Sequence, residues 1–162
     1  MHELIILSAK YLFLFVIAGI GVTWLLVPKD QKLKAALSII AAGVIAVVLS
    51  RIASKLYYDP RPFVTEHVKP LIAHANDNGF PSDHALLTMT LTAIAYFYNK
   101  KIALAMLLLT VIVGVARILA KIHSPLDIGA GWLFGIIGAV AGYYIVHYFW
   151  TRPQSKAQPP KA

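Results

Sequence analysis

Three short polar segments interrupt an otherwise apolar chain, and they contain the residue types that phosphate chemistry uses. The first holds Arg61 between two prolines, the second is residues 80–84 (Phe-Pro-Ser-Asp-His), and the third runs from Arg117 through His123 to Asp127. Arginine binds phosphate through a planar fork of donors, and histidine can act as a nucleophile or as a proton donor. The segments therefore predict a site that binds and transfers a phosphoryl group.

The third segment places a histidine four residues before an acid. Asp127 can accept the Nδ1–H of His123, which would fix the tautomer and leave Nε2 free as a nucleophile. Ser124, Pro125 and Asp127 also fit the N-cap, N1 and N3 positions of a helix, so Asp127 has a purely structural explanation as well. The two roles are compatible.

The second segment opens a helix-like run in which Ser82 suits the N-cap, and capping alone would explain that serine. A helix N-terminus also presents free N–H groups to an anion. Counted from a turn at 99–101, His84 and Arg117 each lie about 24 Å along their helices, because each residue rises 1.5 Å. The two side chains are therefore expected at the same depth.

Long apolar runs surround these segments. The chain of 162 residues is 59% hydrophobic and 14% charged, whereas soluble domains are about 45–50% apolar and about 25% charged. Because a membrane span takes roughly 20 mostly apolar residues, helices are expected at 4–27, 35–58, 84–98, 102–122 and 125–150. The predicted fold class is all-α: a polytopic membrane bundle of about five transmembrane helices, forming one domain at 1–150. A disordered cytoplasmic tail, 151–162, is expected to follow.

The last predicted helix carries small residues at a regular spacing. Gly131, Gly135, Gly138 and Gly142 fall on one helical face, which allows another helix to approach closely in lipid. Packing within the bundle is favoured over dimerisation as the reason for this pattern.

Basic residues gather on one side of the predicted bundle. With five spans, the 28–34 loop, the 99–101 turn and the tail share a side and hold more than half of the 15 basic residues. The positive-inside rule makes this side cytoplasmic and places the three polar segments on the extracytoplasmic side. No nucleic-acid partner is expected, because no RNA- or DNA-binding motif accompanies the charge.

No cofactor and no metal are expected. The chain has no cysteine, and no compact ligand spacing such as His-Glu-x2-His appears. A metal site stays open as an alternative, with the ligands drawn from His67, His74, Asp77, Asp83 and His84.

The segments resemble the pattern of the type 2 phosphatidic acid phosphatase (PAP2) superfamily, which is Lys-x6-Arg-Pro, Pro-Ser-Gly-His and Ser-Arg-x5-His-x3-Asp. Matching residues are Arg61-Pro62, Pro81-Ser82-x-His84 and Arg117-x5-His123-x3-Asp127. The chain departs from the pattern at three positions: Lys55 stands one residue late, Asp83 replaces the glycine and Ala116 replaces the serine. The acid in the second motif, the weakened first motif and the five-helix plan resemble the undecaprenyl-diphosphatase (bacitracin-resistance) branch.

This resemblance implies a PAP2/chloroperoxidase-like core and a metal-independent phosphatase. It implies that His123 is the nucleophile, that His84 protonates the leaving group and then activates water, and that Asp127 orients His123. The residues expected to bind phosphate are Arg61, Arg117, Ser82, Asp83 and Lys55. Arg51, one helical turn before Lys55, could line the wall of the pocket but is not assigned to the site.

The leading prediction is hydrolysis of undecaprenyl diphosphate to undecaprenyl phosphate plus phosphate, through a phosphohistidine. The alternatives are a phosphatase for phosphatidic acid or phosphatidylglycerophosphate and, outside enzymes, a lipid-binding or channel protein that retains the fold. The expected partners are a polyprenyl or phospholipid phosphate substrate and the membrane lipids. The expected location is the cell membrane, with the site on the extracytoplasmic side.

Overall fold

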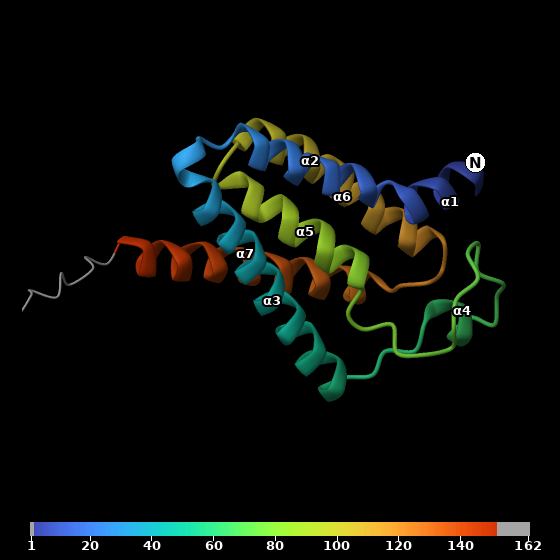
Figure 1. Ribbon diagram of the computed structural model, residues 1–162. Coiled ribbons are helices and arrows are strands. Elements are labelled where there is room, and N and C mark those ends of the chain that lie inside the picture. Colours follow the sequence, from blue (N-terminus) through green and yellow to red (C-terminus); the bar gives the residue numbers. More distant parts are fainter. Residues whose placement is uncertain (1, 152–162) are drawn as a thin grey trace, which may run out of the picture.

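The computed structural model describes residues 2–151, which form a bundle of helices and no strand (Figure 1). The N-terminal arm consists of α1 (His2–Tyr11) and α2 (Phe13–Leu26), followed by the 3-10 helix η1 (Lys29–Gln31). The remaining helices are α3 (Lys32–Leu56), α4 (Pro62–Thr65), α5 (Asp83–Tyr96), α6 (Lys100–Leu119) and α7 (Pro125–Thr151). The predicted all-α class is confirmed.

Four helical stretches are long and apolar enough to cross a membrane: His2–Leu26, Lys29–Leu56, Lys100–Leu119 and Pro125–Thr151. The third predicted helix, 84–98, is α5, whose 14 residues extend only about 21 Å at 1.5 Å per residue. The first predicted helix, 4–27, corresponds to the stretch His2–Leu26, which Leu12 divides into α1 and α2. The predicted disordered tail lies outside the described residues, apart from Thr151, which ends α7.

The short helix α5 lies at the centre of the bundle and packs against α2, α3, α6 and α7. The main core cluster joins these helices through Val16, Ile20, Ala42, Ile94, Ala95, Ala103, Met106 and Ala139. The hydroxyls of buried threonines in α5 have hydrogen-bond partners within the bundle. The hydroxyl oxygens of Thr92 and Thr110, for example, lie 2.9 Å apart. The position of α5 explains why a helix too short to span the bilayer is nevertheless stable.

The glycines of α7 pack within the bundle, as the sequence predicts. A Cβ on Gly131 would lie 2.9 Å from the carbonyl oxygen of Ser82, so this glycine lets α5 approach α7. A Cβ on Gly142 would collide with the backbone of Ala42, so α3 lies equally close on the other side. The small residues therefore hold α7 between α3 and α5.

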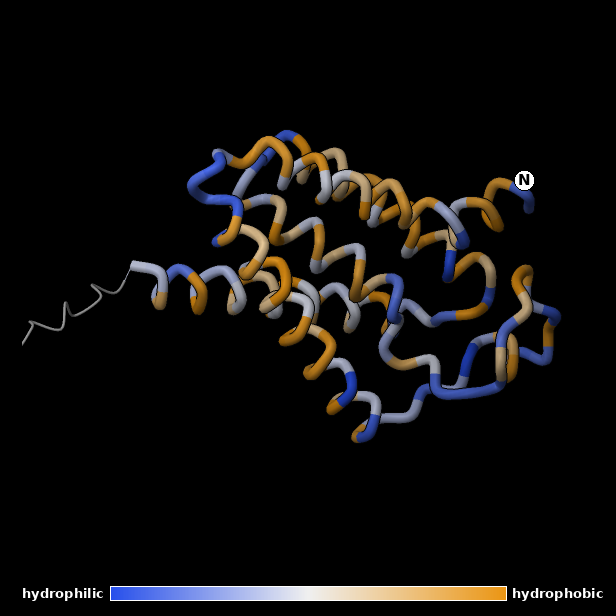
Figure 2. The backbone as a smooth tube through the Cα atoms, in the orientation of Figure 1, coloured by the Kyte–Doolittle hydropathy of each residue, from blue (hydrophilic) through white to orange (hydrophobic). Residues whose placement is uncertain are grey.

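Apolar side chains cover the outside of the bundle between two polar ends (Figure 2). Leu4, Leu25, Ile40, Leu104 and Leu133 are each more than half exposed, and they come from five different helices. A surface of this kind suits hydrocarbon rather than water, so the chain is a membrane protein. The C-terminal ends of α3 and α6 and the N-terminal ends of α5 and α7 meet at one end of the bundle (Figure 1).

Candidate active site

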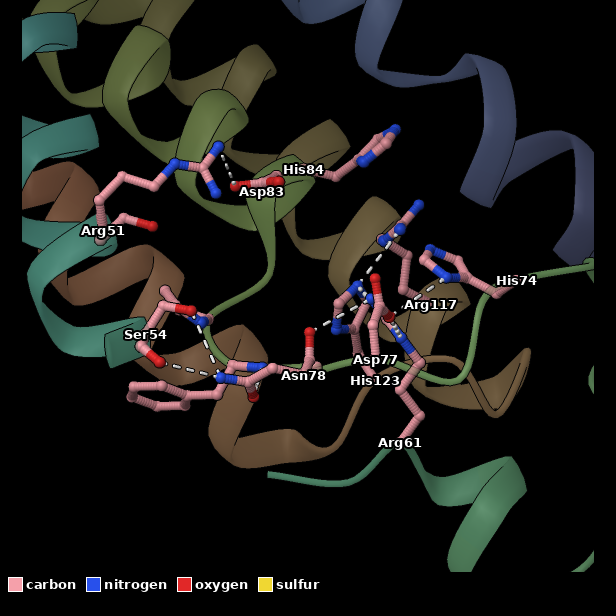
Figure 3. A pocket seen from close by; sticks show the side chains of 14 residues that line it. Arg51, Ser54, Arg61, His74, Asp77, Asn78, Asp83, His84, Arg117 and His123 are labelled. Atoms are coloured by element: carbon pink, nitrogen blue, oxygen red, sulfur yellow. Dashed lines mark hydrogen bonds and ion pairs between the residues drawn. The ribbon is translucent and has the colours of Figure 1, made fainter. Parts of the chain in front are cut away.

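A cavity of about 420 Å³ opens at the end of the bundle where these helix ends meet. Five of the predicted site residues line it: Arg61, Asp83, His84, Arg117 and His123 (Figure 3). The structure therefore brings residues from all three polar segments to one cavity, as the sequence predicts.

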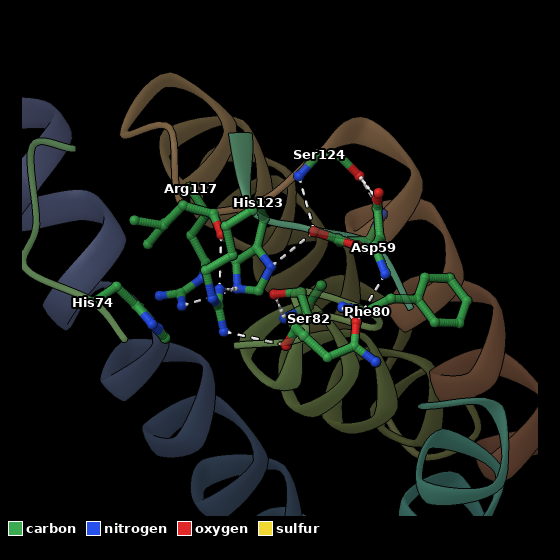
Figure 4. Close-up of polar contacts among 12 residues, drawn as sticks. Asp59, His74, Phe80, Ser82, Arg117, His123 and Ser124 are labelled. Carbon is green, nitrogen blue, oxygen red and sulfur yellow. Dashed lines mark hydrogen bonds and ion pairs between the residues drawn. The ribbon is translucent and has the colours of Figure 1, made fainter. Parts of the chain in front are cut away.

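His123 and Asp127 form a buried pair. Figure 4 shows the polar contacts around His123 and Ser124. Nδ1 of His123 lies 3.1 Å from Oδ2 of Asp127, which also accepts the backbone N–H of Ser124 at 2.9 Å. The N–H of Asp127 donates in turn to Oγ of Ser124, whose hydroxyl donates to Asp59. Asp127 thus takes part in the cap of α7 and holds the imidazole at the same time. With the proton on Nδ1, the lone pair of Nε2 is directed toward the cavity.

Arg61 is fixed on the cavity wall by three different groups. Arg61 is 5% exposed, and it follows Pro60 as the N-cap residue of α4. Its Nε donates to Asp77 at 2.7 Å, and one terminal nitrogen donates to the carbonyl of Ile122 at 2.7 Å. That same terminal nitrogen lies 3.5 Å from Nε2 of His123. These bonds hold one guanidinium beside the candidate nucleophile.

Arg117 approaches the same nitrogen from the other side. It is 6% exposed, and one terminal nitrogen lies 3.2 Å from Nε2 of His123. Its other terminal nitrogen donates to the carbonyl of Ala9, while Nε has no partner among the described residues. Two buried guanidinium groups therefore flank Nε2, which is where the charge of a transferring phosphoryl group would lie.

The surroundings of His123 favour its neutral form. Burial lowers the pKa of His123 below its ordinary 6.5, and the positive charges of Arg117 and Arg61 act in the same direction. The hydrogen bond to Asp127 opposes them without reversing the direction. A neutral imidazole is the form that can attack phosphorus.

The second segment contributes His84 to the cavity and Ser82 to its support. The ring of His84 lines the cavity and meets the ring of Phe13 edge-on, with centroids 4.9 Å apart. Ser82 is fully buried, and its hydroxyl accepts the N–H of Ala85 as the N-cap of α5. Ser82 is not among the residues that line the cavity, and its predicted contact with phosphate stays a prediction.

In the first segment, the predicted phosphate contact of Lys55 also stays a prediction. Lys55 is exposed and does not line the cavity, whereas Arg51 and Ser54 of the same helix do. Successive side chains of a helix point about 100° apart, so the residue after Ser54 faces away from the cavity. Asp83 lies on the wall, where its carboxylate is 3.7 Å from the guanidinium of Arg51. Asp83 thus forms an ion pair with a cation of the wall, and its predicted place among the phosphate-binding residues stays a prediction.

The loop before α5 contains site residues that sequence reasoning did not assign. The amide of Asn78 donates to the carbonyls of Ser54 and Tyr57 and accepts the N–H groups of Asp59 and Phe80. Asn78 thereby ties the first segment to the second. The run of Asn, Asp and Gly at 76–79 is typical of a turn with side-chain hydrogen bonds, which is the pattern that could have indicated this role.

The same loop bears on the alternative metal site. The carboxylate of Asp77 accepts a hydrogen bond from Arg61, and this bond holds the pKa of Asp77 below its ordinary range. His67 is exposed and does not line the cavity. Among residues 2–151, no three His, Asp or Glu side chains are grouped as metal ligands. The alternative set of five ligands is therefore not assembled here.

The fold and the site define a membrane-embedded, all-helical phosphatase. The chain belongs to the PAP2 superfamily, whose family model matches residues 31–151. The family membership predicted from the three segments is confirmed.

Two curated relatives and one solved structure are similar to this chain. The bacitracin transport permease protein BcrC of Bacillus licheniformis is 33% identical over 95% of this chain and 73% of the relative. The undecaprenyl-diphosphatase BcrC of Bacillus subtilis is 33% identical over 59% of this chain and 49% of the relative. The crystal structure of LpxE from Aquifex aeolicus matches 88% of this chain and 93% of its own, with a TM-score of 0.58 and 22% identity. The names of the two relatives agree with the predicted branch, and LpxE shares the fold.

Proposed function

We propose that this chain hydrolyses undecaprenyl diphosphate to undecaprenyl phosphate and phosphate. The observation that carries the proposal is the position of His123, whose Nδ1 faces a buried carboxylate while Nε2 faces two buried guanidinium groups. A lipid-binding or channel protein needs no such polarised imidazole. The substrate rests on the undecaprenyl-diphosphatase of Bacillus subtilis, which is similar to this chain.

In the first step, Nε2 of His123 attacks the terminal phosphorus and forms a phosphohistidine. The bond between that phosphorus and the bridging oxygen breaks, and undecaprenyl phosphate leaves. Arg61 and Arg117 balance the charge on the oxygens of the phosphoryl group, which is the main task of a protein in this chemistry. Asp127 stabilises the imidazole as it gains positive charge, and it keeps the ring in one orientation.

His84 serves as the acid and base. In the first step it gives a proton to the departing oxygen, and in the second step it takes a proton from the attacking water. Water then breaks the P–N bond, which releases phosphate and restores His123. Both histidines line one cavity, so His84 faces the space that a phosphoryl group on His123 would occupy.

The site faces the extracytoplasmic side in this proposal. Lys29 lies in η1, Lys34 near the start of α3, and Lys100 and Lys101 at the start of α6. These helix ends lie at the opposite end of the bundle from the start of α5 (Figure 1). The positive-inside rule makes that end cytoplasmic. The product lipid phosphate would then form on the outer leaflet.

A substrate panel tests the proposal on the purified protein in detergent with EDTA. Phosphate release from undecaprenyl diphosphate, phosphatidic acid and phosphatidylglycerophosphate is measured for the wild type, His123→Ala and the control His67→Asn. We expect the highest kcat/KM for undecaprenyl diphosphate, release at background level for His123→Ala, and wild-type activity for His67→Asn, which alters an exposed loop residue outside the cavity.

Three results would contradict parts of the proposal. Unchanged release by a folded His123→Ala protein would remove His123 as the nucleophile. Loss of activity in EDTA that Mg²⁺ restores would remove the metal-independent mechanism. A wild-type protein that releases phosphate from none of the lipids would favour lipid binding or transport, which the name of the permease relative describes for that protein.

A further inference from the structure

The cavity continues from His123 toward helix α3, where a second polar wall lies. Ser50, Arg51 and Ser54 from α3 line that wall, with Asp83 beside them (Figure 3). Ser50 and Arg51 lie outside the segments that surround His123, and Ser54 stands seven residues before Arg61, where the family pattern has its lysine. A volume of about 420 Å³ falls in the range of ligand pockets, and one phosphate on His123 leaves much of it free.

Ser50 has a buried hydroxyl that nothing in residues 2–151 satisfies. Its side chain is 1% exposed, it lines the cavity, and its Oγ has no hydrogen-bond partner. A buried polar group without a partner costs free energy, so such groups in a cavity wall point to a ligand that completes them. A hydroxyl can donate to a phosphate oxygen.

The neighbours of Ser50 supply a second hydroxyl and a positive charge. Ser54 lies one turn further along α3 on the same face, and its Oγ accepts the amide of Asn78 at 3.3 Å, so its own proton remains free to donate. Arg51 is held only loosely, because its 3.7 Å ion pair with Asp83 joins two side chains that are each 66% exposed. Its guanidinium can therefore turn to an anion at low cost.

We propose that Ser50, Arg51 and Ser54 form a subsite for the second, lipid-linked phosphate of a diphosphate ester. The proposal rests on the function proposed above, in which Arg61, Arg117 and His123 bind the terminal phosphate. The bridging oxygen then lies between Arg51 on one side and Arg61 and Arg117 on the other, near His84. Negative charge grows on the lipid-linked phosphate as the bridging P–O bond breaks, and Arg51 stabilises that charge. The subsite thus selects diphosphate esters over monophosphate esters.

Paired substrates test the subsite. Farnesyl diphosphate and farnesyl monophosphate share one hydrocarbon chain, so their kcat/KM values differ only through the second phosphate. We expect Arg51→Gln to lower kcat/KM about tenfold or more for the diphosphate, as loss of a charged hydrogen bond does, and less than about threefold for the monophosphate. Ser50→Ala should act in the same direction with a smaller effect.

Lys69→Gln is the matched control, because it removes one positive charge from an exposed position in the loop before α5. It should leave the ratio of the two kcat/KM values unchanged. Equal losses on both substrates in Arg51→Gln would overturn the proposal, because Arg51 would then act on the terminal phosphate. No loss on either substrate would overturn it as well.

Inhibition gives a second measurement that separates this proposal from the function on which it rests. Inorganic pyrophosphate and inorganic phosphate are compared as inhibitors of farnesyl monophosphate hydrolysis. Arg51→Gln should raise the inhibition constant of pyrophosphate about tenfold and leave that of phosphate unchanged. If His123→Ala abolishes hydrolysis but Arg51→Gln changes neither constant, the phosphatase assignment survives and the subsite does not.

Discussion

Arg117 and Ala9 are joined by a hydrogen bond of 3.2 Å from the guanidinium to the backbone carbonyl, although 108 positions separate them. Ala9 lies in the last turn of α1, where helical carbonyls lack a partner within the helix. Leu12 separates α1 from α2. The family model begins at residue 31, so this arm lies outside the matched region. The arm nevertheless holds one of the two arginines beside His123, and its Phe13 contacts His84.

Phe13 is therefore expected to position His84. Phe13→Ala removes the edge-on contact between the two rings, and aromatic pairs of this kind contribute about 0.5–1.5 kcal/mol. We expect kcat to fall about two- to tenfold and the limb of the pH profile that belongs to His84 to shift. Phe15→Ala is the control, because Phe15 is 64% exposed on the same helix. Equal kcat values and pH profiles in the two variants would show that the contact with Phe13 does not position His84.

Asp77 forms an ion pair with Arg61 and should compete with phosphate for it. Its carboxylate lies 2.7 Å from Nε of Arg61 on the cavity wall and stays ionised at neutral pH, because the hydrogen bond from Arg61 lowers its pKa. The Asp77 side chain is 56% exposed, and exposed pairs contribute about 0.2–1 kcal/mol. Asp77→Asn should therefore lower the inhibition constant of inorganic phosphate about two- to fivefold.

The same measurement on Asp30→Asn controls for the change in net charge, since Asp30 lies in η1 at the opposite end of the bundle. A higher inhibition constant in Asp77→Asn would reverse the interpretation. The carboxylate would then position Arg61 for phosphate rather than compete for it.

Much of the fold was predictable because the helices follow from apolar runs that a bilayer requires. The meeting of the three segments was predictable because five spans place them at the same end of the bundle. His84 and Arg117 line one cavity there. The break at Leu12 was not predictable, because neither proline nor glycine marks it.

The direction of single side chains was the least predictable part of the site. Lys55 and Ser54 differ by one residue, yet the rotation of α3 turns only Ser54 to the cavity. Asn78 lies in a loop whose path depends on hydrogen bonds to α3 and to the segment after it, so its role appears only once both are in place.

Gly79 should be essential for the geometry of the His–Asp pair. A Cβ on this residue would lie 2.8 Å from Oδ2 of Asp127 and 3.2 Å from the carbonyl of Asp59. Gly79→Ala must move one of these groups, and displacements of about 1 Å can cost up to about 100-fold in rate, so we expect kcat to fall at least tenfold. Gly129→Ala is the control, because a Cβ there meets nothing within 4 Å. Wild-type kcat in Gly79→Ala would show that the pair tolerates the shift.

The pH dependence of kcat/KM reports the protonation of His123. The nucleophile must be neutral, and its pKa lies below 6.5 because it is buried beside Arg117 and Arg61, so activity should persist at pH 6.5 and fall only at lower pH. The hydrogen bond to Asp127 raises this pKa in part. Removing the charge in Asp127→Asn should therefore move the acid limb to still lower pH.

Asp127→Asn should also lower kcat by about 10²–10⁴-fold, as loss of the orienting carboxylate does in other histidine-based sites. Profiles of kcat/KM against pH for the wild type and the variant check both effects in one experiment. A limb that moves to higher pH in the variant would mean that the titrating group is not His123. An unchanged kcat would mean that Asp127 only caps α7, because the bond from the N–H of Asp127 to Ser124 would survive the substitution.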